Sequence, residues 1–152
     1  MILAGDIGGT KTVLSLLTKD KSGQLICQNE QVFHSQHFLA FNDILDDFLP
    51  QDCLIKSACF GVAGPIINQR CQTTNLPWLL EAEVLKIRFL GAQIKLINDL
   101  EAMALGMLHL SNDELLELNP MQKHKRGILR LSLQELGWVK HYYFGMGIVI
   151  TL

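Results

Sequence analysis

The chain has 152 residues, of which 49% are hydrophobic and 18% charged, and its formal net charge is −2. This length favours one globular domain. The charge does not favour a nucleic acid partner, because the only basic run, residues 123–126, is short and typical of a solvated loop. No apolar stretch is long enough to cross a bilayer, so we expect no membrane partner, and the first residues lack the charged start of a signal peptide. The four cysteines form no C-x-x-C pair, which argues against a zinc site and predicts reduced thiols in a cytoplasmic protein.

Three strand-like segments open the chain, at residues 2–9, 11–19 and 23–33. The short turns at Gly8-Gly9 and Ser22-Gly23 predict that these segments form antiparallel hairpins. Residues 41–50 then place their apolar side chains on one helical face, and Pro50 ends this helix.

Strands and helices alternate further along the chain. Buried or alternating apolar patterns predict strands at residues 53–65, 67–75 and 92–98. Amphipathic patterns predict helices at residues 77–91 and 99–110, and a short helix or turn at 111–120. Because hairpins come first and crossovers follow, this order predicts the α/β class, with a mixed five-stranded sheet flanked by helices.

The segment "GDIGGTKT", residues 5–12, carries the first chemical signal. Two glycines in a tight turn between strands let backbone N–H groups approach a phosphate without a Cβ in the way. Thr10 adds a hydroxyl donor, and Asp6 is placed to hold Mg²⁺ through water. The motif by itself also fits an ordinary glycine hairpin, and it lacks the Lys-Ser/Thr pair of a P-loop.

The segment "LINDLEAMALG", residues 96–106, carries the second signal. Asp99 follows a predicted strand and opens a predicted helix, which is where α/β sheets present catalytic groups. Asp99 could accept a proton from a hydroxyl nucleophile, and Asn98 could hydrogen-bond the same substrate. The competing interpretation is a helix cap, because Asn98 followed by Glu101 fits a capping box.

Two further segments, "FGVAGPI" (60–66) and "TTNLPW" (73–78), form the third cluster. The first predicts a tight backbone corner beside a ligand cleft. In the second, Asn75 and Trp78 are residue types that line sugar sites. A simple turn followed by a helix with a core tryptophan explains this second segment equally well.

Taken together, these four segments resemble the N-terminal half of bacterial-type glucokinases, which belong to the actin-like, ribonuclease-H-like ATPase superfamily. The resemblance covers about residues 1–120 and rests on the order and separation of all four motifs. It implies a ribonuclease-H-like domain and phosphorylation of glucose at its 6-hydroxyl. The implied cofactors are ATP and Mg²⁺, the implied partner is glucose, and the full-length form is implied to be a homodimer.

The resemblance also assigns roles to individual residues. It implies that the ATP-phosphate loop consists of Gly5, Asp6, Ile7, Gly8, Gly9 and Thr10, with Asp6 as the metal ligand. Asp99 matches the catalytic base, Asn98 its sugar-binding neighbour, and Asn75 lies in the sugar-side loop. Lys11 departs from the pattern, since these glucokinases often have Asn there. "GGTK" is more typical of a related kinase and repressor family, so another sugar kinase of that family, or a noncatalytic sugar-binding module, stays open.

The end of the chain does not fit the resemblance. A second phosphate motif similar to "GTGLG" should follow soon after residue 125, but the chain continues "GILRLSLQELGWVKHYYFGMGIVITL". A shifted frame takes the third base of each codon from Gly127 onward together with the first two bases of the next codon. With a suitable choice of synonymous codons, this frame encodes "NPALIAAGTGLGEALLFWDGDRHYP". Glycine is forced at two points of that reading, where Trp138 precedes Val139 and where Met146 precedes Gly147.

This pattern predicts two segments of different origin. Residues 1–126 are expected to be the N-terminal lobe of a glucokinase-like fold, and residues 127–152 an out-of-frame tail, with the second lobe missing. Such a chain is expected to be inactive alone, because positioning ATP and sugar between two lobes supplies much of the catalysis. The alternative is a natural short protein with a divergent C-terminal strand.

Overall fold

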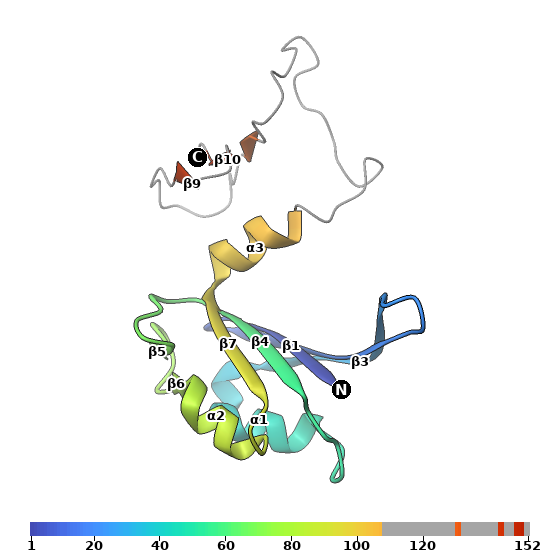
Figure 1. Ribbon diagram of the computed structural model, residues 1–152. Helices are drawn as coiled ribbons and strands as arrows, with labels where there is room; N and C mark the ends of the chain where they lie inside the picture. Colours follow the sequence, from blue (N-terminus) through green and yellow to red (C-terminus); the bar gives the residue numbers. More distant parts are fainter. Residues whose placement is uncertain (108–129, 132–142, 145–147, 151–152) are drawn as a thin grey trace. The chain divides into compact units, whose positions relative to one another are not determined.

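The computed structural model of the chain describes residues 1–107, 130–131, 143–144 and 148–150 (Figure 1). The chain divides into two compact units, Met1–Leu110 and Ser111–Leu152. The helix or turn predicted at 111–120 lies outside the described residues, as do the last residues of the helix predicted at 99–110. No helix in the described part of the chain has the length and apolar character needed to cross a membrane.

The first unit is built on a mixed sheet of five strands in the order β3-β2-β1-β4-β7. The strands are β1 (Ile2–Ile7), β2 (Lys11–Lys19), β3 (Leu25–His34), β4 (Ser57–Val62) and β7 (Gln93–Asn98). β1, β2 and β3 pair antiparallel as two successive hairpins, whereas β4 pairs parallel to both β1 and β7. The predicted mixed sheet with hairpins first is therefore confirmed.

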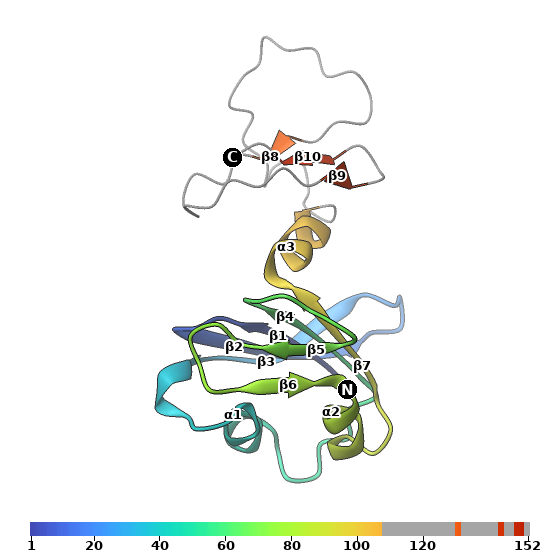
Figure 2. The same cartoon turned by 90° about the vertical axis from the view of Figure 1, so that its left-hand side faces the viewer.

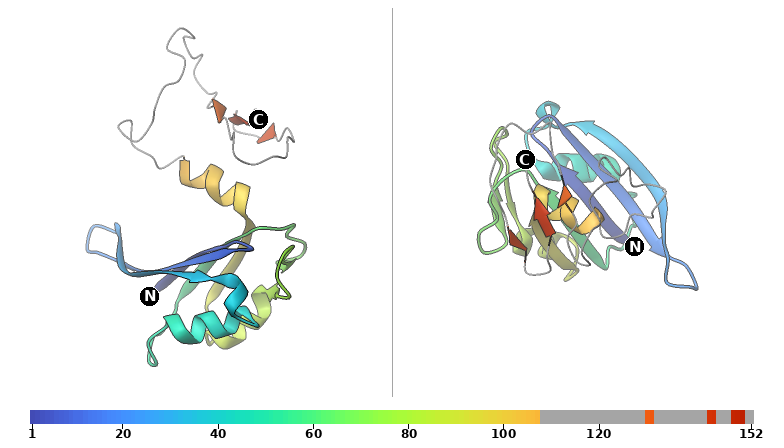
Figure 3. Two further views of the ribbon diagram at one scale, coloured as in Figure 1. Left: turned by 180° about the vertical axis from the view of Figure 1, so that it is seen from behind. Right: turned by 90° about the horizontal axis from the view of Figure 1, so that it is seen from above.

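Helices α1 (Phe41–Phe48) and α2 (Ala82–Arg88) cover one face of this sheet (Figures 1 and 3). The apolar stripe of α1 is buried at Phe41, Ile44, Leu45 and Phe48, as its spacing predicts. Helix α3 (Asp99–Met107) starts directly after β7 and packs against β4, where a Cβ on Gly61 would lie 3.0 Å from the Cβ of Ala102. The lack of a side chain at Gly61 thus lets α3 approach the sheet closely.

Phe60 lies at the centre of the core. Its side chain is fully buried, and its ring meets that of Phe41 edge-on, with centroids 5.2 Å apart. On the neighbouring strand, a Cβ on Gly5 would lie 2.7 Å from Phe60 Cδ1 and 2.8 Å from Leu14 Cδ2. Gly5 therefore makes room for two large core side chains from within β1.

The helix predicted at 77–91 begins later than its pattern suggests. Residues Leu79–Glu81 form a short strand, β6, that pairs antiparallel with β5 (Arg70–Gln72) ahead of α2 (Figure 2). Leu80 points into the core, and Arg70 forms an ion pair with Glu81 across this hairpin. Cross-strand pairing overrides helical periodicity here, so the prediction was wrong for these first residues, while the extra strand expected within 67–75 is confirmed.

The remaining described elements are a 3-10 turn, η1 (Ser35–His37), in the first unit and three short strands in the second. The latter are β8 (Arg130–Leu131), β9 (Tyr143–Phe144) and β10 (Ile148–Ile150), in the order β8-β10-β9.

The packing predicts that Phe60→Ala destabilises the first unit by about 3–5 kcal/mol, because it removes a fully buried ring from the sheet centre. Urea unfolding followed by far-ultraviolet circular dichroism measures this change. Leu39→Ala is the matched control, since Leu39 is 88% exposed and its loss should cost less than about 0.5 kcal/mol. Equal urea midpoints for the two variants would contradict this view of the core.

Candidate functional site

The carboxyl ends of three parallel strands define the candidate site. Ile7 of β1 pairs with Val62 of β4, which pairs in turn with Asn98 of β7, so the three strands end at the same level. The chain segments that follow them are the Gly8–Thr10 loop, the Ala63-Gly64 corner and Asn98-Asp99. Ligands of α/β sheets bind outside such strand ends, and the structure therefore gathers the sequence motifs at a position suited to chemistry.

The glycine loop makes a tight turn between β1 and β2. The N–H of Gly8 donates to the carbonyl of Lys11 at 3.0 Å, and a Cβ on Gly8 would lie 2.9 Å from that same oxygen. Only glycine fits this position without displacing the backbone. The turn thus brings peptide groups to the surface with little side-chain bulk above them, as a phosphate cradle requires.

The six residues predicted to form the phosphate loop, 5–10, lie partly at the surface and partly against the core. Asp6 and Thr10 are exposed, and Gly8 and Gly9 are half-buried, so these four can face a ligand. Ile7 is fully buried in the core, while Gly5 accommodates Phe60. The structure gives Gly5 and Ile7 a supporting position on the core side, and their membership of an ATP site stays a prediction.

Asp6 and Asp99 come within electrostatic reach of each other. Although Asp6 is exposed by surface area, the protein atoms around its carboxylate exclude part of the water, which raises its pKa above the ordinary value, and the negative charge of Asp99 raises it further. A cation between or beside two such carboxylates relieves both effects. Mg²⁺ commonly takes one or two carboxylates, several waters and substrate phosphates, which fits Asp6 together with the glycine loop. Residues 1–107 contain no cluster of three or more His, Cys, Asp or Glu side chains that could hold a metal by themselves.

Asn98 uses both ends of its side-chain amide. Its Nδ2 donates to the carbonyl of Gly64 at 3.0 Å, and its Oδ1 accepts from the N–H of Leu100 at 3.0 Å. The second bond is an N-cap interaction, so the predicted helix cap at Asn98 is confirmed, whereas within the described residues Glu101 makes no return bond and the full capping box is not formed. The first bond fixes the end of β7 to the corner that follows β4. Asn98 therefore holds the site together, and its contact with a sugar stays a prediction.

Asp99 is half-buried at the start of α3. Its Oδ1 accepts from the N–H of Leu100 at 2.9 Å, which orients the carboxylate. In the part of the chain that the structure describes, Oδ2 has no protein hydrogen-bond donor. One oxygen is thus held by the helix end, and the other is available to a proton donor such as a substrate hydroxyl.

Asn75 lies against the glycine loop. A Cβ on Gly9 would approach Asn75 Cβ to 3.0 Å and Nδ2 to 3.2 Å. The loop that carries Asn75 is held by Thr73, whose hydroxyl donates toward the carbonyls of Leu76 at 3.0 Å and Trp78 at 3.1 Å. The structure therefore places an exposed amide next to the candidate phosphate loop.

Trp78 belongs to the core. Its side chain is 2% exposed, and its Nε1 donates to the carbonyl of Phe38 at 3.2 Å. Of the two interpretations open at the sequence level, the core tryptophan is the one that the structure supports.

Sequence reasoning missed Gln69. The side chain of Gln69 accepts from the N–H of Leu96 at 2.8 Å and donates to its carbonyl at 3.2 Å. It thereby acts as a strand partner for the outer edge of β7, two residues before Asn98. Its backbone is left-handed, with φ of 57°, and the sequence contains no signal that would single out this glutamine.

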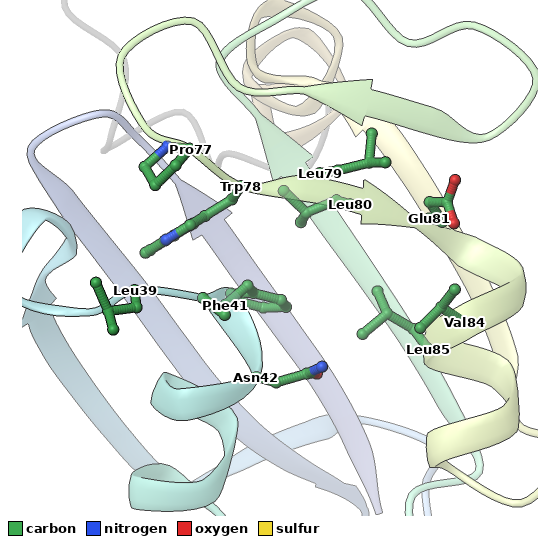
Figure 4. Close-up of a pocket in the computed structure, with 11 residues that line it drawn as sticks. Leu39, Phe41, Asn42, Pro77, Trp78, Leu79, Leu80, Glu81, Val84 and Leu85 are labelled. Atoms are coloured by element: carbon green, nitrogen blue, oxygen red, sulfur yellow. The ribbon is translucent and has the colours of Figure 1, made fainter.

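Apart from the strand ends, a hollow of about 140 Å³ lies between α1, β6 and α2 (Figure 4). Its lining is mainly apolar and includes Phe41, Trp78 and Leu85. It contains none of the residues at the strand ends, and its one carboxylate, Glu81, is paired with Arg70. This hollow therefore offers no group suited to phosphoryl or proton transfer.

The sheet order, the parallel strands that follow the hairpins and the polar groups at their ends define an α/β lobe of the actin-like ATPase class. The chain matches a crystal structure of glucokinase from an Antarctic psychrotroph with a TM-score of 0.69 and 27% identity, over 86% of this chain and 43% of that one. The family model described as Glucokinase matches residues 3–131. The chain belongs to the glucokinase family.

Curated relatives agree with this assignment. The chain is 36% identical over 124 residues to a glucokinase of Synechocystis sp., covering 74% of this chain and 35% of the relative. It is 36% identical over 127 residues to a glucokinase of Nostoc punctiforme, covering 82% of this chain and 36% of the relative. The chain thus spans about a third of the length of the curated relatives that it matches.

The Asp6–Asp99 pair predicts that Asp99→Asn lowers the pKa of Asp6 toward the ordinary value of 3.8. Because the folded chain binds the Asp6 proton more tightly than the unfolded chain, ionised Asp6 reduces stability, and this loss develops as pH rises from 3.8 through the higher folded pKa. Carboxyl-detected NMR titration measures the pKa directly.

Asp47→Asn removes an exposed carboxylate from α1 and is the matched control for this titration. It should leave the pKa of Asp6 unchanged. If the pKa of Asp6 is the same in Asp99→Asn as in the unsubstituted chain, the two carboxylates do not interact as described.

Proposed function

We propose that residues 1–126 form the N-terminal lobe of a glucokinase that transfers phosphate from ATP to the 6-hydroxyl of glucose. The observation that carries this proposal is the common level at which β1, β4 and β7 end, because it brings the glycine loop, Asp6 and Asp99 to one edge of the sheet. The family assignment supports the reaction class. Glucose is proposed because the matched relatives are called glucokinases.

Each group at the strand ends has a proposed role. The N–H groups of Gly9 and Thr10 would face the phosphates of ATP, and Asp6 would hold Mg²⁺ through water. When bound, Mg-ATP supplies the phosphoryl group and the positive charge that offsets its negative oxygens. Asn75 and Asn98 would contact the sugar.

Asp99 is proposed as the general base. Its Oδ2 accepts the proton of the sugar's 6-hydroxyl while that oxygen bonds to the γ-phosphorus and the bond to the ADP oxygen breaks. The hydrogen bond from Leu100 to Oδ1 keeps the carboxylate turned for this transfer. The proton ends on Asp99, and ADP carries away the electron pair of the broken bond.

We further propose that residues 127–152 are translated out of frame. In the shifted frame, glycine is required at Trp138-Val139 and at Met146-Gly147, and two further pairs of codons each require a leucine. The codon of His141 ends in C or T and that of Tyr142 begins with TA, so the shifted triplet is CTA or TTA, and both encode leucine. The same holds for Tyr142 followed by Tyr143. The shifted reading thus contains a required Leu-Leu directly after "GTGLGEA".

If this is so, the present chain holds half of a catalytic site. The "GTGLG" motif would supply a second phosphate loop from the other lobe. Only the protein that continues in the shifted frame after about codon 127, here called the read-through protein, would hold ATP and sugar together. Positioning of this kind is worth about 7–11 kcal/mol. We therefore propose that the 152-residue chain does not turn over ATP with glucose.

Two properties of the full-length protein complete the proposal. We propose a cytoplasmic location, supported by the free thiols of Cys27, Cys53, Cys59 and Cys71. We also propose a homodimer, on the basis of the family resemblance. Cell fractionation and sedimentation of the read-through protein test these points, and secretion or a monomer at all concentrations would overturn them.

Coupled assays of ADP formation test the function. The protein read through in the second frame should phosphorylate glucose, and Asp99→Asn should lower its turnover by about 10²–10⁴-fold because the general base is lost. Asp47→Asn, which changes the same chemical group on the exposed side of α1, should leave turnover unchanged.

The 152-residue chain should form no ADP in the same assay. Glucose-dependent turnover by this chain that disappears in Asp99→Asn would show that one lobe suffices. Full activity of the read-through Asp99→Asn variant would remove Asp99 from the proposed role.

A further inference from the structure

Ser35 lies directly beneath the glycine loop, at the start of the 3-10 turn η1. Its side chain is fully buried, and its Oγ donates to the carbonyl of Gly8 at 2.8 Å. Its backbone N–H donates to the carbonyl of Thr10 at 2.9 Å. One residue from a distant part of the chain thus binds two carbonyl groups of the loop.

Thr12 supports Ser35 from β2. The two hydroxyl oxygens lie 3.0 Å apart, and both side chains are fully buried. Because the single hydroxyl proton of Ser35 goes to Gly8, Thr12 must be the donor in this contact. The result is a directed chain of hydrogen bonds that runs from Thr12 through Ser35 to the loop.

The Ser35 bond fixes the direction of a peptide group that the proposed function needs. The carbonyl of Gly8 and the N–H of Gly9 belong to the same trans peptide, so they point in opposite directions. With the carbonyl held toward Ser35, the N–H of Gly9 points away from the core. Within residues 1–107, no protein group accepts a hydrogen bond from the N–H of Gly9 or Thr10.

Because two glycines flank this peptide, its orientation depends on the hydrogen bond from Ser35. The peptide between Gly8 and Gly9 has no Cβ on either side, so its rotation meets little steric resistance. A rotated peptide would present the Gly8 carbonyl oxygen, which repels a phosphate, in place of the Gly9 N–H, which binds one. The loop therefore needs an external hydrogen bond to keep its donors outward.

We propose that Ser35 is a positioning residue that keeps the carbonyls of Gly8 and Thr10 turned inward and the N–H of Gly9 available to a phosphate. The inference rests on the proposed function, because the phosphate is that of ATP. Thr12 contributes less, since it holds Ser35 and not the loop itself.

Two measurements on the 152-residue chain test this role. The first uses no ligand and records the amide resonances of Gly9 and Thr10 by NMR. The second titrates Mg-ATP and follows the same amides. Ser35→Ala is the main variant, and Ser35→Cys, which keeps the size of the side chain but donates weakly, is the second. Ser15→Ala is the matched control, because it removes a hydroxyl that lies on β2, as Thr12 does, but is bonded to Glu30 of β3 and not to the loop.

In Ser35→Ala, we expect the amide resonances of Gly9 and Thr10 to shift while the core resonances stay in place. Affinity for Mg-ATP should fall about tenfold, as expected for the loss of one buried hydrogen bond at a binding loop. Ser35→Cys should lie between Ser35→Ala and the unsubstituted chain, Thr12→Val should have a smaller effect, and Ser15→Ala should have none.

The outcomes separate this inference from the proposed function. Unchanged loop amides in Ser35→Ala would overturn the positioning role, whatever the ligand does. If the unsubstituted chain binds no Mg-ATP but its loop amides respond to Ser35→Ala, the positioning role stands and the ATP site is contradicted. If Ser35→Ala unfolds, Ser35→Cys decides, and loop amides identical to those of the unsubstituted chain would overturn the role.

Discussion

The parallel pairing of β4 with both β1 and β7 is the constraint on which the candidate site depends. Because Ile7, Val62 and Asn98 stand at the same level, every segment that follows these strands starts from one edge of the sheet. A slip of one residue between two of the strands would turn their buried side chains to the other face. Core packing around Phe60 therefore fixes the register and, through it, the distance between Asp6 and Asp99.

Small side chains then bring the site together. Glycine at position 61 lets α3 come close to β4, and glycine at position 9 lets Asn75 reach the loop. Polar side chains hold these close approaches in place, since Asn98 binds the Gly64 carbonyl and Gln69 binds the edge of β7. Partial loss of water around the Asp6 carboxylate, and then the negative charge of Asp99, raise the pKa of Asp6 in this lobe. A site that receives a divalent cation can use such a pair.

Much of this lobe could be predicted from the sequence, because local patterns determine it. Glycine turns indicated the hairpins, and the spacing of apolar residues indicated α1 and the buried strands. The start of α2 could not be predicted, since the pairing of Leu79–Glu81 with β5 is a contact between segments that helical periodicity does not report. The same reason hides Gln69 and Ser35, whose side chains act on residues 27 positions away along the chain. Asn98 caps α3, which is one of its two predicted roles, and it also binds the carbonyl of Gly64, a distant contact that no local pattern indicates.

We propose that this lobe belongs to a two-lobed kinase whose continuation lies in another reading frame. Sequencing codons 120–152 of the gene from an independent source tests it most directly. The account predicts an inserted or deleted base near codon 127, with third bases that spell "GTGLG" in the shifted frame and an open frame beyond it. An intact frame whose third bases spell no kinase-like sequence would contradict the account and make residues 127–152 a native part of the chain.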